Sequence, residues 1–444
     1  MSEPTTPPLD DRRMNRRAFI GASSGTLLAL AAMRANGQSL EDITKAQHDD
    51  SAKNLGPTNA TLDQLNSDVF MPPPTDRGEP PQFWSSFSEA RRRVQPGGWT
   101  RQVTVQDFPI SKDIAGVNMR LTTAGIRELH WHNAGEWGIV LSGKLRLTCI
   151  DSYGRAFIDD LGPNDIWFFP TGVPHSIQGL PPDGTEFLLV FDDGKFTEDN
   201  TTLISDWLRH TPPEVVAKNF GLTEQQIAPV YNVPPEGKFI FVGSTPGSLE
   251  DDQKAAYASQ GPSPTKFSFH MSQMKPDIQR EFGEVRIIDS HNFPVANPVG
   301  TPANAAPAPA SLTVSAAYIT VKPGGLRELH WHQNADEWQY YIKGKGRMTV
   351  FFNGAHARTA DFNAGDVGYV PRTLGHYIEN TGSEDLVFLE MFKAPLFEDL
   401  SLSEWVTHIP AKLLKDHIGI SKDDVLSKVP DVKQAIVPVN SPKG

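Results

Sequence analysis

Two copies of one six-residue motif are the strongest chemical signal in this chain. The sequence Arg-Glu-Leu-His-Trp-His occupies residues 127–132 and recurs unchanged at residues 327–332. Two histidines separated by one residue on a β-strand point to the same face, because side chains alternate along a strand. Each copy therefore predicts a pair of imidazoles directed at one point. The repetition predicts a duplicated module with two sites of one chemistry.

Each motif is followed by a glutamate and a third histidine at nearly matched distances in the two halves. The expected metal ligands are His130, His132, Glu136 and His175 in the first half, and His330, His332, Glu337 and His376 in the second. Three imidazoles with one carboxylate suit manganese(II) or iron(II), with coordination positions left for substrate or water. Structural zinc usually prefers a closed tetrahedral set, often rich in cysteine. A single His-x-His pair is more often part of a half-exposed strand, but two complete sets favour metal binding.

The two halves differ in the segment after the last predicted barrel strand. In the first half this segment, residues 196–207, is three residues longer than its counterpart at residues 397–405. The extra residues are polar and acidic, so the segment could form a mobile lid with Glu198 as an acid or base. By itself an acidic loop is more often a solvated turn. The rival candidate is Glu379, which follows the last ligand of the second half where the first half has an amide, Gln178.

The remaining sequence predicts an all-β protein that positions these residues on short strands. Short apolar runs separated by Gly, Pro, Asn and Asp are typical of a sandwich or barrel. The length of 444 residues suits two domains of similar size. Trp131 and Trp331, between the paired histidines, are expected to face away from the metal and to pack. The only cysteine, Cys149, excludes an internal disulfide and is expected in a strand core.

Composition also suggests domain boundaries. We expect an extended, proline-rich N-terminal arm at residues 38–99 that wraps the first domain, a first domain at residues 100–233, and a second domain at residues 234–444. Short helices should flank the barrels, one of them over residues 205–221 with a serine cap and a terminating glycine. Residues 297–310, rich in Pro and Ala, are expected to form a solvated loop.

The charge and the N-terminus limit the partners and the location. A formal net charge of −12 argues against nucleic-acid binding, which needs a basic face, but not against a small anionic substrate. Residues 1–37 contain Arg16 and Arg17 before an apolar run too short to span a membrane. This pattern is typical of a twin-arginine export signal, so we expect a periplasmic or secreted protein with no membrane span. A plain surface tail is the alternative.

With these motifs the chain resembles the bicupin oxalate decarboxylases, from about residue 84 to residue 433. Beyond the histidine motifs, the likeness rests on residues 187–194, 337–341 and 365–371. The resemblance implies two tandem jelly-roll β-barrels with short flanking helices and a manganese(II) ion in each barrel. It implies dioxygen-dependent cleavage of oxalate to formate and carbon dioxide. It also implies a homo-oligomer, a hexamer built from trimers.

The resemblance further implies roles for individual residues. The N-terminal site of that family is regarded as catalytic, and a lid glutamate distinguishes its decarboxylases from oxalate oxidases. Glu198 occupies the matching position, although its neighbours in residues 197–201 depart from the commonest decarboxylase lid. Arg127 would stabilise the substrate carboxylate and the radical anion, with Arg327 equivalent in the second site. Acid–base work by a carboxyl group requires a pKa near the working pH, so activity is expected to be best in mild acid.

Other functions stay open on the sequence. An oxalate oxidase would release hydrogen peroxide, and peroxide and formate assays separate it from a decarboxylase. A non-enzymatic cupin would bind a ligand or store metal, although two intact ligand sets speak against this. An iron-dependent dioxygenase would use the same scaffold, and elemental analysis would identify it.

Overall fold

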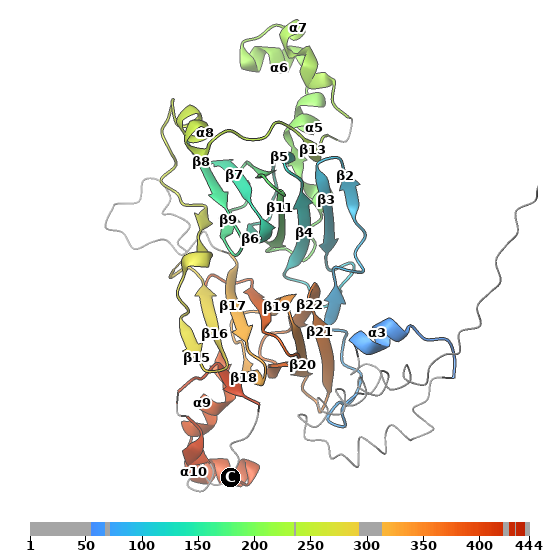
Figure 1. Ribbon diagram of the computed structural model, residues 1–444, viewed down its shortest axis with the longest axis vertical. Coiled ribbons are helices and arrows are strands. Elements are labelled where there is room, and N and C mark those ends of the chain that lie inside the picture. The colour runs from blue at the N-terminus through green and yellow to red at the C-terminus, as the bar shows by residue number, and fades with distance from the viewer. Residues whose placement is uncertain are drawn as a thin grey trace, which may run out of the picture.

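The protein consists of two β-barrels stacked along its long axis, with short helices extending from both ends (Figure 1). The computed structural model describes residues 55–66, 72–234, 237–292, 313–420, 426–430 and 432–439. The predicted export signal and the loop at residues 297–310 lie outside these residues. Among the described residues, no helix is long and apolar enough to cross a membrane.

The first barrel is formed by two antiparallel sheets. Its core strands are β4 (Ala115–Leu121), β5 (Gly125–Trp131), β6 (Glu136–Gly143), β7 (Leu145–Ile150), β8 (Ala156–Leu161), β9 (Ile166–Phe169), β10 (His175–Gly179) and β11 (Thr185–Phe191). One sheet has the order β9-β6-β11-β4 and the other β5-β10-β7-β8. Strands β2 (Arg93–Gln95) and β3 (Gly98–Val103) extend the first sheet, while β12 (Thr202–Leu203) and β13 (Ile240–Val242) pair with β5. The chain passes repeatedly from one sheet to the other, which is the arrangement of the predicted jelly roll.

The second barrel repeats the arrangement. Its core strands are β17 (Ser315–Val321), β18 (Gly325–Trp331), β19 (Glu337–Lys343), β20 (Lys345–Phe351), β21 (Ala357–Asn363), β22 (Asp366–Val370), β23 (His376–Asn380) and β24 (Leu386–Phe392). The sheet orders are β22-β19-β24-β17 and β21-β20-β23-β18. Strands β15 (Ile278–Arg280) and β16 (Gly283–Ile288) extend the first of these sheets, and β25 (Leu400–Ser401) and β26 (Ile436–Pro438) pair with β18. The tandem bicupin fold is therefore confirmed.

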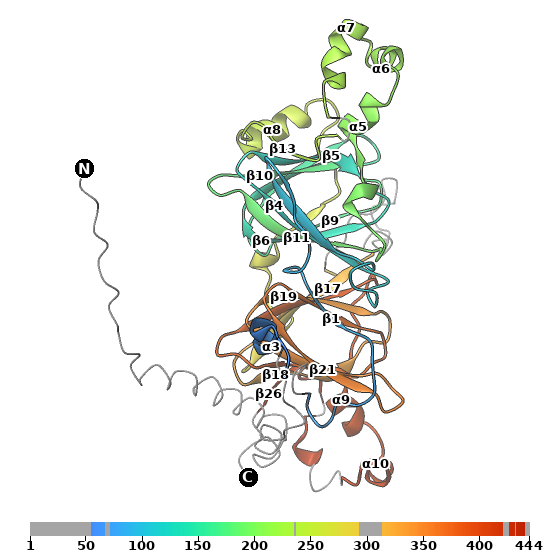
Figure 2. The same cartoon turned by 90° about the vertical axis from the view of Figure 1, so that its right-hand side faces the viewer.

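Each barrel receives an edge strand from a segment outside it. Strand β1 (Trp84–Ser86) of the N-terminal arm pairs with β22 of the second barrel, and β14 (Ser268–Phe269) of the central connection pairs with β9 of the first. Asp76 accepts hydrogen bonds from the backbone and hydroxyl of Thr359, and α3 (Ala60–Leu65) lies beside the second barrel (Figure 2). The prediction that the arm wraps the first domain is therefore wrong for this part of it. An added strand covers the backbone groups of the β22 edge.

The apolar core continues from one barrel into the other. Nearly all residues of β11 and all of β24 are buried, because side chains on both faces of these central strands enter apolar surroundings. At the junction, Trp338 of the second barrel packs against Gly116 of the first, where an added Cβ would lie 2.6 Å from the indole. The edge of Phe108 also meets Tyr369 at a ring-centroid distance of 6.3 Å. The two barrels therefore pack directly on each other.

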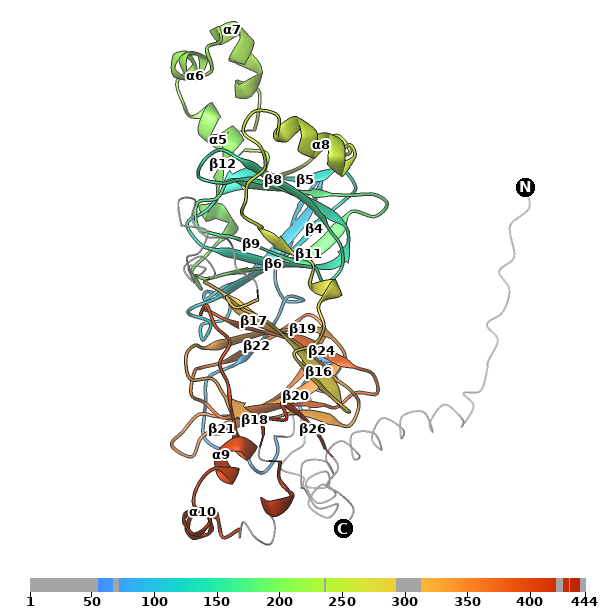
Figure 3. The same cartoon turned by 90° about the vertical axis from the view of Figure 1, so that its left-hand side faces the viewer.

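The flanking helices are short. They are α5 (Ile204–Arg209), α6 (Pro213–Phe220), α7 (Glu224–Ile227), α8 (Leu249–Ala256), α9 (Leu402–Thr407) and α10 (Ala411–Ile418). The single helix predicted at residues 205–221 is divided, because Pro212 cannot continue it, and its N-cap is Leu203 rather than a serine. It ends as predicted at Gly221, in the left-handed conformation with φ of 66°. Helix α8 packs beside β8, on the side turned to the viewer in Figure 3.

Candidate metal centres and lid

The structure brings together each predicted set of four ligands. In the first barrel His130 of β5 lies opposite His175 of the neighbouring β10, and His132 follows on the same strand. Glu136 begins β6 in the other sheet, so residues 133–135 carry the chain across the barrel. The ligand atoms of this first cluster lie within 4.8 Å of one another, and all four side chains are buried. The second cluster, formed by His330, His332, Glu337 and His376, satisfies the same limit.

The imidazoles are oriented for metal binding. Nδ1 of His130 lies 2.6 Å from the carbonyl oxygen of Glu128, and Nδ1 of His175 lies 2.8 Å from that of Val173. A carbonyl can only accept, so Nδ1 carries the proton and the lone pair of Nε2 points into the cluster. Burial, and then the charge of Arg127, hold the pKa of His130 well below its usual value, which favours the neutral ligand form.

Polar atoms without partners point into both clusters. Within the described part of the chain, the buried Nε2 atoms of His175, His330 and His376 have no hydrogen-bond partner of normal geometry, although those of His175 and His376 lie 3.4 and 2.7 Å from the ligand carboxylates. A buried nitrogen that aims at a carboxylate and lacks a partner is unusual unless an ion completes its interactions. Three imidazoles and a carboxylate in this geometry fit a manganese(II) ion in each barrel.

The two ligand glutamates are held by different donors. Trp167 of β9 donates from its indole N–H to Glu136 at 2.8 Å. In the second barrel Gln339 of β19 donates from its amide to Glu337 at 2.7 Å. The strand opposite Trp167 has Gly138, where an added Cβ would lie 2.2 Å from the indole. In the second barrel the larger residue, Gln339, lies on the strand that bears the ligand glutamate, and the glycine opposite it is Gly368 of β22. Both solutions fix the orientation of the metal-facing carboxylate.

A bulge in β5 turns Arg127 toward the first cluster. Residues 127 and 130 are an odd number of positions apart and would face opposite sides of a regular strand. The register against β10 shifts between these residues, and the same irregularity occurs in β18 of the second barrel. Both Arg127 and His130 are therefore buried on the barrel side. A bulge of this kind redirects a side chain at a functional site.

Arg127 binds the predicted lid glutamate. Glu198 lies in a 3-10 turn, η2 (Glu198–Asn200), and its carboxylate accepts from the Arg127 guanidinium at 3.1 Å with both side chains buried. The backbone N–H of Glu198 donates to Gln102 at 3.2 Å, and at the outer side Asp199 pairs with the partly exposed Arg93 at 3.3 Å. We call residues 197–201 the lid. A cavity of about 480 Å³ opens along it and is lined by both lid carboxylates.

Burial disfavours the charged forms of the lid pair. It raises the pKa of Glu198 against the opposing effect of Arg127, and it lowers the pKa of Arg127 against the opposing effect of Glu198. The attraction between the two groups therefore does not fully offset their desolvation. A glutamate with a raised pKa, close to a metal cluster, is suited to accept and return a proton.

The second arginine has a different environment. Arg327 binds Glu390 at 3.1 Å and Asp399 at 2.7 Å. Asp399 follows Phe397 at the same offset at which Glu198 follows Phe196. The three extra lid residues of the first barrel lie between its carboxylate and β12, whereas Asp399 directly precedes β25. This offset is present in the sequence, but the prediction rested on the difference in segment length and did not include Asp399.

Glu379 does not reach the second cluster. It is three residues from His376 on β23 and is therefore directed to the other face of the strand, where its register partner is Arg347. Burial raises the pKa of Glu379, with Arg347 opposing and Asp361 adding to the shift. The prediction that Glu379 is a rival acid or base near the second metal is thus corrected. Glu390 and Asp399 are the carboxylates beside Arg327.

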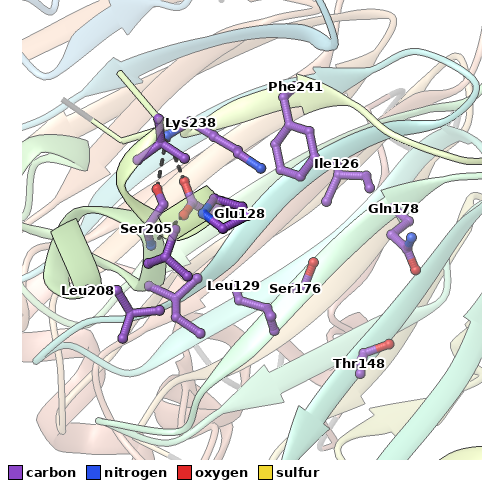
Figure 4. A pocket seen from close by; sticks show the side chains of 14 residues that line it. Ile126, Glu128, Leu129, Thr148, Ser176, Gln178, Ser205, Leu208, Lys238 and Phe241 are labelled. Carbon is purple, nitrogen blue, oxygen red and sulfur yellow. Dashed lines mark hydrogen bonds between the residues drawn. The ribbon is translucent and has the colours of Figure 1, made fainter. Parts of the chain in front are cut away.

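The glutamate within each motif has a positioning role that the sequence did not reveal. Glu128 is buried, and its carboxylate accepts from the backbone N–H groups of Ser205 at 2.8 Å and Lys238 at 2.9 Å (Figure 4). It also accepts from the backbone N–H of Phe239 at 2.8 Å. These bonds fix the start of α5, just after the lid, and the residues before β13. Glu328 accepts the equivalent bonds from Gln434 and Ala435. The sequence did contain one indication of this role, because the glutamate is present in both copies of the motif.

Two structural predictions are confirmed. Trp131 and Trp331 lie outside the clusters and pack edge-on against Trp207 and Trp405, with ring centroids 5.4 and 5.6 Å apart. Cys149 is buried in β7. Burial raises the pKa of its thiol well above the usual value, in keeping with a core residue.

Comparisons with known proteins agree with this site. The family model described as Cupin matches residues 85–228 and again residues 269–425. Oxalate decarboxylase OxdC of Bacillus subtilis is 48% identical over 374 residues, which cover 84% of this chain and 91% of the relative. A probable oxalate decarboxylase of Arthroderma benhamiae is 38% identical and covers 86% of this chain and 90% of the relative. A solved structure of the Bacillus enzyme with its Mn(II) centres superposes with a TM-score of 0.80 at 45% identity, covering 88% of this chain and 97% of that one.

Proposed function

The chain belongs to the cupin family and, within it, to the bicupin oxalate decarboxylases, and on this basis we propose that it converts oxalate to formate and carbon dioxide. The reaction depends on manganese(II), with one ion in each barrel, and on dioxygen. The observation that carries the proposal is the buried pair of Arg127 and Glu198 beside the first cluster. It adds an anion-binding group and a proton carrier to a metal site.

Oxalate is difficult to cleave without help, because direct loss of carbon dioxide would leave a very poor acyl anion. Manganese, when bound, supplies open coordination positions and the one-electron chemistry that makes this loss easy. We assign the remaining work to side chains of the first barrel. Arg127 binds a carboxylate of the substrate through charge-assisted hydrogen bonds.

Glu198 moves the proton. Hydrogen oxalate contains the same atoms and charge as formate plus carbon dioxide, so the overall reaction needs only that one proton change place. Glu198 takes the proton from the substrate carboxyl group and returns it to the carbon from which carbon dioxide has departed. The raised pKa of Glu198 brings the two protonation states closer in free energy at mildly acid pH.

Aromatic side chains close the site beside the lid. Phe191 and Phe196 stack with ring centroids 3.5 Å apart, and Phe196 also meets the ring of His132 edge-on at 5.6 Å. These rings and the closed lid exclude water from the reacting carbon. Exclusion of water favours formate over complete oxidation to carbon dioxide, the reaction of an oxalate oxidase.

The proposal is tested by product analysis. Manganese-loaded protein and oxalate under air should give one formate and one carbon dioxide for each oxalate consumed, with little hydrogen peroxide. Stoichiometric peroxide without formate would identify an oxidase instead. Oxalate that stays intact while both sites contain manganese would identify a metal-binding protein without this activity.

We also propose that the chain forms a homo-oligomer, a hexamer of the kind expected for this family. Large apolar side chains that are exposed on the terminal helices, including Trp207, Phe220 and Trp405, support this. Light scattering at micromolar concentration tests it, with a monomer as the contrary result.

Export through the twin-arginine pathway is a further proposal, supported by Arg16, Arg17 and the apolar run after them. Retention of the unprocessed protein in the cytoplasm of the source cell would contradict it.

A further inference from the structure

The ring of Phe239 lies between two arginines. The guanidinium carbon of Arg127 lies 4.0 Å from the ring centroid, and that of Arg93 lies 3.8 Å from it. One face of a phenyl ring has room for only one guanidinium at these distances, so the two groups flank the ring. Phe239 is 1% exposed. A cation over an aromatic face is attracted by the ring quadrupole, and the attraction is greater where water is excluded.

The backbone of Phe239 is held in an uncommon conformation. Its φ is 57°, in the left-handed region that large side chains rarely adopt. The N–H of Phe239 donates to the carboxylate of Glu128 at 2.8 Å, and its carbonyl oxygen accepts from the backbone of Glu128 at 2.9 Å. The ring is therefore fixed from the same strand that carries Arg127.

The second barrel offers a matched comparison. Ala435 has the same conformation, with φ of 59°; its N–H donates to the carboxylate of Glu328, and its carbonyl oxygen accepts from the backbone N–H of Glu328. The duplicated backbone thus carries a phenyl ring in one barrel and a methyl group in the other. At the second position Arg327 is fixed instead by two carboxylates, Glu390 and Asp399.

The difference matters when the lid opens. Among the described residues, Glu198 is the one carboxylate that pairs with Arg127, and it belongs to the lid. When Glu198 moves away, the ring of Phe239 still contacts the guanidinium. A ring attracts the cation without neutralising it, so the positive charge stays available for an incoming carboxylate. A second fixed carboxylate, as at Arg327, would compete with oxalate.

We propose that Phe239 is a positioning residue that holds Arg127 in place for the oxalate carboxylate while the lid is open. The same ring also supports Arg93, the outer partner of the lid through Asp199. Phe239 thus contacts both the substrate-binding arginine and the arginine that anchors the closed lid. This inference rests on the proposed function, since it assigns Arg127 to oxalate.

A series of fluorinated phenylalanines at position 239 tests the inference. Fluorination weakens the negative face of the ring with little change in size, so the fold and the packing are kept. Because Arg127 binds the substrate before and during the reaction, KM for oxalate should rise stepwise, reaching roughly tenfold for the most fluorinated ring, with kcat changed less than about twofold. Phe239→Leu should raise KM to a similar extent, and Phe239→Tyr should leave it near the value of the unchanged protein.

Phe241 provides the matched control. It lies on β13, two residues after Phe239, and faces the outer pocket of Figure 4, where Lys238 rather than Arg127 lies over its ring at 4.9 Å. The same fluorinated residues and Phe241→Leu should leave KM unchanged. A KM that is constant along the series at position 239, in protein with full manganese content, would overturn the inference. So would an equal response at both positions. Formate production by the unchanged protein is measured in the same assay, so loss of the proposed function itself would be recognised separately.

Discussion

The two arginines of the duplicated motif occupy the same position in the two barrels but have different carboxylate partners. Arg327 lies between Glu390 and Asp399, and burial, which alone would lower its pKa, is outweighed by these carboxylates so that the pKa is raised. The pKa of Arg127 is lowered, because burial outweighs its single partner Glu198. Equal metal ligands therefore do not imply equal sites. The first arginine can exchange its partner for a substrate, whereas the second is already neutralised.

The length of the segment after the last barrel strand adds to this difference between the sites of Arg127 and Arg327. Three extra residues separate Glu198 from β12, whereas Asp399 directly precedes β25, which is hydrogen-bonded to the strand of the second cluster. Asp399 also pairs with Lys433. We therefore expect Glu198 to leave with its lid, while Asp399 is fixed to the metal-bearing sheet. We expect catalysis in the first barrel on this basis.

The largest effect on formate production is expected when the lid of the first barrel is shortened to the length of the corresponding segment of the second. Deletion of residues 199–201 gives the first barrel the connection length of the second and prevents independent movement of Glu198. Because general acid–base catalysis is lost, formate production should fall by about 10²–10⁴-fold while manganese content is retained. Steady-state formate assays with elemental analysis measure this. Full activity of the deletion variant would mean that lid length does not distinguish the barrels.

The free energy of unfolding should fall more when a carboxylate beside Arg327 is removed than when the carboxylate beside Arg127 is removed. Asp399→Asn leaves the buried Arg327 and the partly exposed Lys433 with one carboxylate fewer, so the free energy of unfolding should fall by about 3 kcal/mol. Glu198→Gln should lower it by less than about 1 kcal/mol, because burial already disfavours the charged pair there. Urea unfolding of the two variants compares them. Equal losses of stability would contradict the distinction.

The donors behind the ligand glutamates should set metal affinity in one barrel each. Trp167→Phe removes the hydrogen bond to Glu136 while preserving an aromatic ring, and we expect manganese affinity of the first site to fall by about 10–100-fold. Gln339→Leu should have the same effect on the second site only. Titration with manganese, followed by spectroscopy of the bound ion, would show two equally weakened sites if these donors were not specific to their barrels.

The pH dependence of the lid should be the smallest effect. Burial raises the pKa of Glu198, so the closed state binds its proton more readily than the open state. Closure is thus favoured at low pH and is lost as pH rises from the ordinary glutamate value through the raised one. The opposite sign applies at Asp399, where burial would raise the pKa but Arg327 and Lys433 lower it to about 2. Its contribution is present at neutral pH and is lost as pH falls toward that value.

Hydrogen exchange at the lid measures this effect. After correction for the intrinsic rate, protection of the Glu198 amide, which donates to Gln102, should decrease by a few fold from pH 4 to pH 7. In Glu198→Gln the protection should not vary with pH. Protection that increases with pH in the unchanged protein would reverse the assigned sign.

Much of the fold and of the metal clusters could be predicted from the sequence, because they depend on local spacing. Alternation along a strand directs His130 and His132 to one side, and duplication confirms the pattern. The part of the arm that contains β1 was assigned to the wrong barrel, since β1 pairs with β22 through contacts between residues far apart in the chain. Such pairing depends on tertiary structure and leaves no local pattern.

The residues around the clusters were harder to predict. Glu379 was chosen because it differs from Gln178, but strand alternation directs it away from the metal, and the true neighbour Glu390 lies on a strand that is hydrogen-bonded to the one bearing Glu337. The bulge that turns Arg127 inward is set by pairing with β10, not by a residue type. The contact of Phe239 with Arg127 joins residues from separate segments, so only the structure could reveal it.

The most direct test compares formate production by Glu198→Gln and Asp399→Asn, each fully loaded with manganese. If the releasable lid glutamate of the first barrel carries the proton, the first variant should lose formate production by about 10²-fold or more, and the second should stay within about threefold of the unchanged protein. Equal losses in the two variants, or a greater loss in Asp399→Asn, would contradict the assignment of catalysis to the first barrel.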